Sequence, residues 1–400
     1  TKNSYGVLIV LLLYTLALHL ALILGFYLSG HAQIALWVAD SYTTHIPGAV
    51  NVANYIHGKE ALISIGVLFD KVFFTQAFVG VFFSFMGANP VSSAIALMLV
   101  KLLAVFVLFH LGKTMFNERV GLAGALIYAF SPTVIYYTTV FYKEAVVQLV
   151  VAAIILFSLK IYLKPSNWRY WPALAVSLAV IINERFYLFF FFVATFILLG
   201  LVAARLSRKL YLAAIVVPAA FGVYALIGKY VDSLARVHIP YHKILPSLFS
   251  LIKGNREGYL SFSDVTAINL SLPYPLAFVK ILFSPFFTLD KFTLFSDYSY
   301  ILIWGSFLNQ AAILLAVYGM YKAVKSDWRR NLLSIFPFFM FLCVFAYVAP
   351  YIGRLRDSFY PIIAIYAAYG FFGVYNAALA LRLKRPQLRE ATAKLSKPTV

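Results

Sequence analysis

Charged and sulfur-bearing residues are scarce in this 400-residue chain. Only 12% of its residues are charged, Asp and Glu together number 14, and 63% are hydrophobic. A soluble protein of this length cannot bury so much apolar side chain, so the composition excludes an ordinary soluble enzyme. The single cysteine, Cys343, lies within an apolar run, which excludes a disulfide framework and a cysteine-based metal site.

Apolar stretches of about 20 residues recur along the chain, each long enough to cross roughly 30 Å of hydrocarbon. They predict an all-α integral membrane protein of about ten transmembrane helices, the first of them an uncleaved anchor. The predicted spans cover residues 5–28, 91–112, 119–137, 144–163, 170–183, 186–204, 210–230, 300–321, 331–349 and 358–381.

The short loops set the predicted orientation. One face collects 19 basic residues against only three acidic ones, Glu118, Asp327 and Glu390, whereas the other face holds 13 basic and 11 acidic residues. By the positive-inside rule this face is cytoplasmic, which predicts a multi-pass protein of the plasma (inner) membrane with both termini inside. The net charge of +19 is then a topology signal that also attracts anionic lipid, and nucleic acid is not an expected partner.

The opposite, outer face receives charged residues of both signs from distant parts of the chain. These are Asp40, Asp70, Lys71, Glu144, Glu184, Arg185, Arg354 and Arg356. Carboxylates and cations gathered at one water–lipid boundary indicate chemistry on a charged lipid.

We expect one transmembrane domain over residues 1–382 and a basic cytoplasmic tail over 383–400. Two long outer segments, 29–90 and 231–299, are expected to cover the bundle. Within the first, Ile46, Ala49, Val50, Ala53 and Ile56 form one helical stripe, which predicts an amphipathic helix in the interface. A second interfacial element is expected over 62–87.

Several stretches carry a family resemblance. They are Asp40 after the first span, Leu68-Phe-Asp-Lys-Val-Phe-Phe74, Phe85-Met-Gly-Ala-Asn-Pro90, Asn117 to Pro132 with Tyr136-Tyr137 and Lys143-Glu144 beyond it, and Gly353-Arg-Leu-Arg-Asp-Ser-Phe-Tyr-Pro361. Their order and common sidedness resemble the GT-C glycosyltransferases that use polyprenyl-phosphate sugars. That group includes protein O-mannosyltransferases and the lipid A aminoarabinose transferase.

The resemblance implies a GT-C-like bundle and an inverting glycosyltransferase. A sugar would move from a polyprenyl-phosphate donor to a hydroxyl of a lipid, glycan or protein acceptor outside the cytoplasm. Asp40 is the expected general base. The donor phosphate and sugar would be held by the remaining outer residues. Lys71, Arg185, Arg354 and Arg356 would bind phosphate, Asp70 would hold Lys71 or sugar hydroxyls, and Glu144 and Glu184 would orient the cations or the acceptor.

Two departures from the group's pattern keep alternatives open. Ser41 stands where relatives often carry a second acidic residue, and Val72-Phe73 follow Lys71 where relatives have prolines. The first departure weakens a metal site, so no metal ligand is assigned, although Asp40 and a partner leave a divalent ion possible. The alternatives are a transporter or flippase for lipid-linked sugars, and a non-catalytic subunit of a membrane assembly.

Structural roles compete with the functional ones. Asp40 is also placed to cap the helix after it, and Lys143-Glu144 to supply helix-end charge. Lys101, within a span, is expected to be buried against a polar partner or carbonyl. Two further groups complete the candidates. His45, His57, His238 and His242 lack the spacing of metal ligands, and Tyr136, Tyr137 and Tyr142 either pack or line a sugar or prenyl groove.

Overall fold

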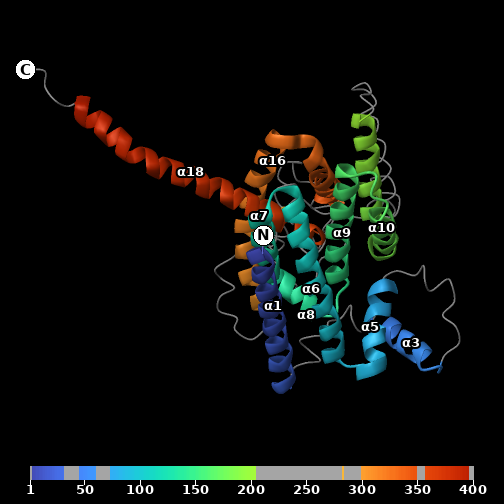
Figure 1. The fold of residues 1–400 in the computed structure, drawn as a ribbon. Coiled ribbons are helices and arrows are strands. Elements are labelled where there is room, and N and C mark those ends of the chain that lie inside the picture. Colours follow the sequence, from blue (N-terminus) through green and yellow to red (C-terminus); the bar gives the residue numbers. More distant parts are fainter. Residues whose placement is uncertain are drawn as a thin grey trace, which may run out of the picture.

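The computed structural model describes residues 2–30, 45–59, 73–203, 282, 299–348 and 356–395. Within these ranges every regular element is helical (Figure 1). The elements are α1 (Lys2–Leu28), α3 (Ile46–Ile56), α5 (Phe73–Met86), α6 (Pro90–Met115), α7 (Glu118–Phe130), α8 (Pro132–Thr139), α9 (Glu144–Leu163), α10 (Tyr170–Ala203), α16 (Ser299–Val348), the 3-10 helix η3 (Asp357–Phe359) and α18 (Tyr360–Leu395).

Six of these helices are long and apolar enough to cross a membrane, or seven if α7 and α8 count as one broken span. The all-α integral membrane fold expected from the sequence is therefore confirmed. The predicted span 210–230 and all but Leu282 and Ser299 of the outer segment 231–299 lie beyond the residues that the structure describes. The predicted tail begins within α18, whose last turns run away from the other helices (Figure 1).

Two pairs of predicted spans are each found in one long helix with an internal break. In α10 the break is at Arg185 (φ −152°, ψ 79°), between the predicted spans 170–183 and 186–204. In α16 it is at Asp327 (φ −155°, ψ 86°), between 300–321 and 331–349. Both breaks coincide with polar residues that interrupt apolar sequence, so the span boundaries were readable from composition.

The expected single span over 119–137 is wrong in one respect, because it bends by 59° between α7 and α8. Ser131 has extended backbone at the junction, and its hydroxyl accepts from the backbone N–H of Val134. Pro132 follows at the first helical position, where its missing N–H costs nothing. These two residues start a new helix rather than continue the old one.

The first outer segment contains a pair of packed helices, α3 and α5, which lie side by side at one edge of the molecule (Figure 1). Ala49, Val52 and Ala53 form the buried face of α3. The predicted stripe was correct for Ala49 and Ala53, whereas Ile56, at its end, is 47% exposed. A Cβ on Gly80 of α5 would lie 2.7 Å from the Ala49 carbonyl oxygen, so the two backbones nearly touch.

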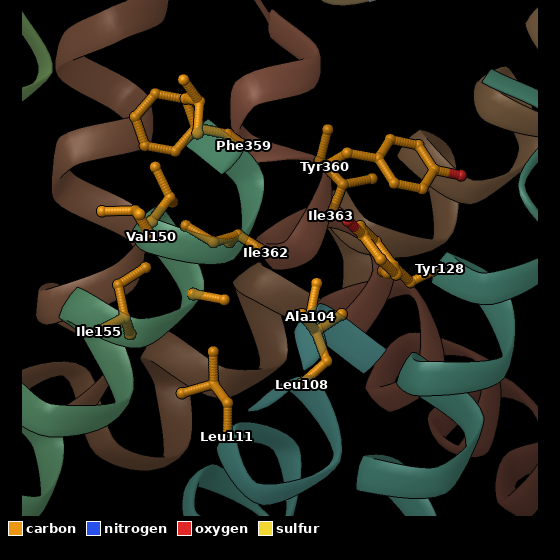
Figure 2. Close-up of a cluster of buried hydrophobic side chains, with 14 of the residues drawn as sticks. Ala104, Leu108, Leu111, Tyr128, Val150, Ile155, Phe359, Tyr360, Ile362 and Ile363 are labelled. Atoms are coloured by element: carbon orange, nitrogen blue, oxygen red, sulfur yellow. The ribbon is translucent and has the colours of Figure 1, made fainter. Parts of the chain in front are cut away.

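The core is built where α6, α7, α9 and the start of α18 meet. Figure 2 shows buried side chains from these helices and from η3 pointing toward one another. They include Ala104, Leu108, Leu111, Tyr128, Val150, Ile155, Phe359, Tyr360, Ile362 and Ile363. This packing fixes the start of α9 beside η3, which is where the charged residues gather.

Helices α16 and α18 approach so closely that only glycine fits between them. A Cβ on Gly370 would overlap the Leu315 carbonyl oxygen, and one on Gly319 would overlap that of Tyr366. Small residues of this kind allow van der Waals packing between membrane helices, which have no hydrophobic driving force between them.

Gly370→Ala is therefore expected to destabilise the protein by about 1–3 kcal/mol, because the added methyl group must push two backbones apart. The measurement is the thermal unfolding midpoint in detergent. Gly25→Ala on α1 is the matched control, since its Cβ would meet nothing within 4 Å. Equal midpoints for the two variants would contradict the close packing of α16 on α18.

Candidate functional site

Four of the eight predicted site residues lie in the described structure, and it brings them to one region. These are Glu144 at the start of α9, Glu184 and Arg185 at the break in α10, and Arg356 directly before η3. Asp40, Asp70, Lys71 and Arg354 lie outside the described residues, so their roles stay predictions.

The centre of this region is a buried ion pair between Glu144 and Arg185. Arg185 Nη2 donates to Glu144 Oε1, and the two side chains are 5% and 0% exposed. Arg185 Nη1 also donates to the Tyr187 hydroxyl at 2.5 Å. In α9 the carboxylate belongs to the first turn, where a negative charge is stabilised by the helix dipole.

The residues before Arg185 reach a different helix. Glu184 Oε1 accepts the backbone N–H of Thr75 at 2.7 Å, and Asn183 Oδ1 accepts that of Phe74 at 3.3 Å. Both donors belong to the first turn of α5. Lys143 Nζ donates to the backbone carbonyl of Glu184 at 3.1 Å, which ties the start of α9 to the same break.

Arg356 is also paired inside the protein. Its Nε and Nη2 donate to Asp357 Oδ1 at 3.1 and 2.8 Å, and both side chains are 2% exposed. Its Nη1 donates to the Leu282 carbonyl oxygen at 2.9 Å. This fixes the residue that lies two positions after the predicted phosphate ligand Arg354.

A hydrogen-bonded chain of polar residues joins this arginine to the core. Gln148 Nε2 donates to the Asp357 carbonyl oxygen at 2.9 Å, and the Tyr128 hydroxyl donates to Gln148 Oε1 at 2.8 Å. Sequence reasoning missed Asp357, Gln148 and Tyr128. A glutamine in an apolar span, one helical turn after Glu144, was the available signal.

The described region holds equal numbers of basic and acidic side chains. Three cations, Lys143, Arg185 and Arg356, stand against three carboxylates, Glu144, Glu184 and Asp357. Buried charges are stable only when paired and hydrogen-bonded, and that condition is met here for the two ion pairs. We call these six residues the charged cluster.

Lys101 lies apart from the charged cluster and is fully buried between α1 and α6. Its Nζ lies 3.3 Å from His19 Nε2, which is also 3.1 Å from the Thr138 hydroxyl. The expected burial against a polar partner is confirmed. His19 was not anticipated as that partner.

Among the remaining candidates, His238 and His242 lie outside the described residues, and the exposed His57 has its Nε2 3.0 Å from the Ser84 carbonyl oxygen. The others take packing positions. His45 is 3% exposed and lies with its ring 5.4 Å from that of Phe141. Tyr136, Tyr137 and Tyr142 contact one another through their rings at 5.4–6.4 Å, beside the start of α9. No group of three His, Cys, Asp or Glu side chains in the described part of the chain is arranged to hold a metal ion.

Comparison with known proteins gives a family match over part of the chain. Residues 70–227 match the family described as dolichyl-phosphate-mannose-protein mannosyltransferase. No curated protein sequence matches the chain significantly.

Among solved structures, the chain is similar to the archaeal oligosaccharyltransferase AglB from Archaeoglobus fulgidus, in complex with an inhibitory peptide and a dolichol-phosphate. The identity is 14% and the TM-score 0.49, with 98% of this chain and 54% of that one covered, so this chain spans about half the length of that protein. The family match confirms the resemblance to the polyprenyl-phosphate-sugar-dependent glycosyltransferases of the GT-C superfamily.

Proposed function

We propose that this chain is a membrane glycosyltransferase that moves a sugar from a polyprenyl-phosphate donor to a hydroxyl acceptor on a lipid, glycan or protein. The reaction takes place at the extracytoplasmic face of the plasma membrane, both termini are cytoplasmic, and Asp40 is the general base. The family match over residues 70–227 supports the class of enzyme and of donor.

The observation that carries this proposal concerns residues close in sequence to Asp40, Lys71 and Arg354. These described residues all lie beside the charged cluster. His45, five positions after Asp40, packs on Phe141, three residues before Glu144. Phe73, two positions after Lys71, begins the helix whose first turn is bound by Glu184.

The third neighbour, two positions after Arg354, is Arg356, which directly precedes η3, and η3 packs against α9. An extended chain covers at most about 7 Å in two residues and about 17 Å in five. Connectivity therefore allows Asp40, Lys71 and Arg354 to reach the charged cluster, and it limits how far Lys71 and Arg354 can lie from it.

The two buried ion pairs indicate which cations serve the donor. A polyprenyl-phosphate sugar is a phosphodiester with one negative charge, and the departing polyprenyl phosphate carries up to two. Because Arg185 and Arg356 already neutralise buried carboxylates, the additional charge must be met by other cations. Lys71 and Arg354 are the two remaining cations in the proposed site. The buried Glu144–Arg185 pair has a structural role beside them.

The proposed reaction is a single displacement at the anomeric carbon. The acceptor oxygen forms a bond to that carbon while the bond to the phosphate oxygen breaks, and the phosphate leaves with the electron pair. The acceptor proton passes to the Asp40 carboxylate. Attack opposite the leaving group inverts the anomeric configuration.

The test uses the purified protein in liposomes that contain polyprenyl-phosphate mannose labelled in the sugar. We expect transfer of label to an added acceptor, release of polyprenyl phosphate that depends on the acceptor, and an inverted linkage by NMR. Movement of intact donor between leaflets without transfer would support the flippase instead. If neither sugar transfer nor movement of the donor between leaflets is seen with a range of donors and acceptors, the result would support a non-catalytic subunit.

A further inference from the structure

The break in α10 is a junction between two helices that are far apart in sequence. On one side of it, Asn183 and Glu184 accept the first backbone N–H groups of α5. On the other side, Arg185 pairs with Glu144 at the start of α9. Three consecutive residues thus hold α5 against the charged cluster.

Burial shows that Glu184 is committed to this contact. Its side chain is 2% exposed, and that of Thr75, whose N–H it accepts, is 0% exposed. The first turn of α5 contains no acidic residue of its own. The helix start, with its unsatisfied N–H groups and positive end, is therefore capped in trans from α10.

The segment fixed in this way is next to the proposed donor-binding residues. Asp70 and Lys71 stand three and two positions before Phe73, the first residue of α5. Helix α3 also packs on α5, at Gly80.

We propose that Asn183 and Glu184 are positioning residues, which cap α5 from a second helix and so fix the helix start that follows the proposed donor ligand Lys71 in the sequence. Glu184 then acts through its acceptor oxygen and not as a ligand of the substrate. This inference rests on the proposed function for its kinetic consequences, but the capping itself can be tested without activity.

The kinetic test compares Glu184→Gln with Glu184→Ala. Glutamine keeps an acceptor oxygen for the Thr75 N–H, so the donor KM is expected to stay within about threefold of the wild-type value. Alanine removes the cap, and the donor KM is expected to rise about tenfold. If glutamine is as damaging as alanine, the carboxylate charge is needed and the proposal is wrong.

A double-mutant cycle tests whether Glu184 acts through Lys71. In a Lys71→Ala background, Glu184→Ala is expected to raise the donor KM by less than about twofold, because the group that it positions is already gone. Fully additive effects would overturn the proposal. Thr195→Val is the matched control, since Thr195 is buried on α10 and its hydroxyl donates only to the Phe191 carbonyl of its own helix among the bonds described.

An accessibility test needs no substrate and separates this proposal from the enzyme assignment. Thr75→Cys in a Cys343→Ala background places the sole cysteine at the buried start of α5. Glu184→Ala is expected to raise its maleimide labelling rate at least about tenfold, whereas Glu184→Gln and Thr195→Val leave it unchanged. Equal protection in all variants would overturn the capping role, even if sugar transfer is demonstrated.

Discussion

Replacing Arg185 with alanine is expected to destabilise the protein by about 3–5 kcal/mol and to abolish sugar transfer. The reason is the Glu144 carboxylate, which is 0% exposed and bonded to the guanidinium. Removing Arg185 takes away the guanidinium that neutralises this carboxylate, in a medium that solvates a charge poorly. The cost is the isolated carboxylate rather than the lost bond.

Thermal unfolding in detergent provides the measurement, and two variants provide controls. Arg329→Ala removes an exposed arginine whose described contact is the ring of Trp328, so its effect is expected to stay within about 0.5 kcal/mol. Glu144→Gln combined with Arg185→Ala removes both charges and is expected to recover part of the lost stability. If the double variant is less stable than Arg185→Ala alone, the uncompensated charge is not the cause.

Arg185→Lys distinguishes charge from geometry. Lysine keeps the positive charge but cannot donate in two fixed directions, as Arg185 does to Glu144 and to the Tyr187 hydroxyl. We expect a stability between those of the wild type and Arg185→Ala, together with weakened transfer.

Asp40→Asn is expected to lower the rate of transfer by about 10²–10⁴-fold, the contribution usual for a positioned general base. Asparagine has nearly the same shape but does not take the acceptor proton. The unfolding midpoint should remain unchanged, because asparagine also serves as a helix cap. Donor binding should be retained, since the proposed phosphate ligands are untouched.

The comparison variant for Asp40 is Asp327→Asn, at the break in α16. Asp327 Oδ1 accepts the Arg330 backbone N–H at 3.2 Å, and asparagine can keep that bond. Its transfer rate should equal that of the wild type. If Asp40→Asn retains more than half of the activity, Asp40 is not the base.

Much of the helical architecture was predictable, because apolar length and polar interruption are local properties of the chain. The spans at α1, α6 and α9, the breaks at Arg185 and Asp327, and the buried Ala49–Ala53 face of α3 all follow from such patterns. The bend between α7 and α8 was missed although Ser131-Pro132 is a local signal. The apolar residues on both sides of Ser131-Pro132 are equally compatible with one continuous transmembrane helix.

The gathering of Glu144, Glu184, Arg185 and Arg356 in one region also followed from the sequence, since membrane topology assigns each loop to a side. The sequence did not predict which of these charged residues would pair with one another. Topology limits depth to a boundary layer, but lateral position in that layer depends on which helices pack together.

By itself, therefore, the sequence determined a helical membrane protein, the breaks in its long helices and the set of charged residues available for a site. Only the tertiary structure decided that Arg185 neutralises Glu144, that Glu184 caps α5 and that Arg356 is held by Asp357. The physical reason is that hydrophobicity along a chain fixes how deep a residue lies. The pairing of buried charges depends on contacts between helices remote in sequence, which side-chain packing alone establishes.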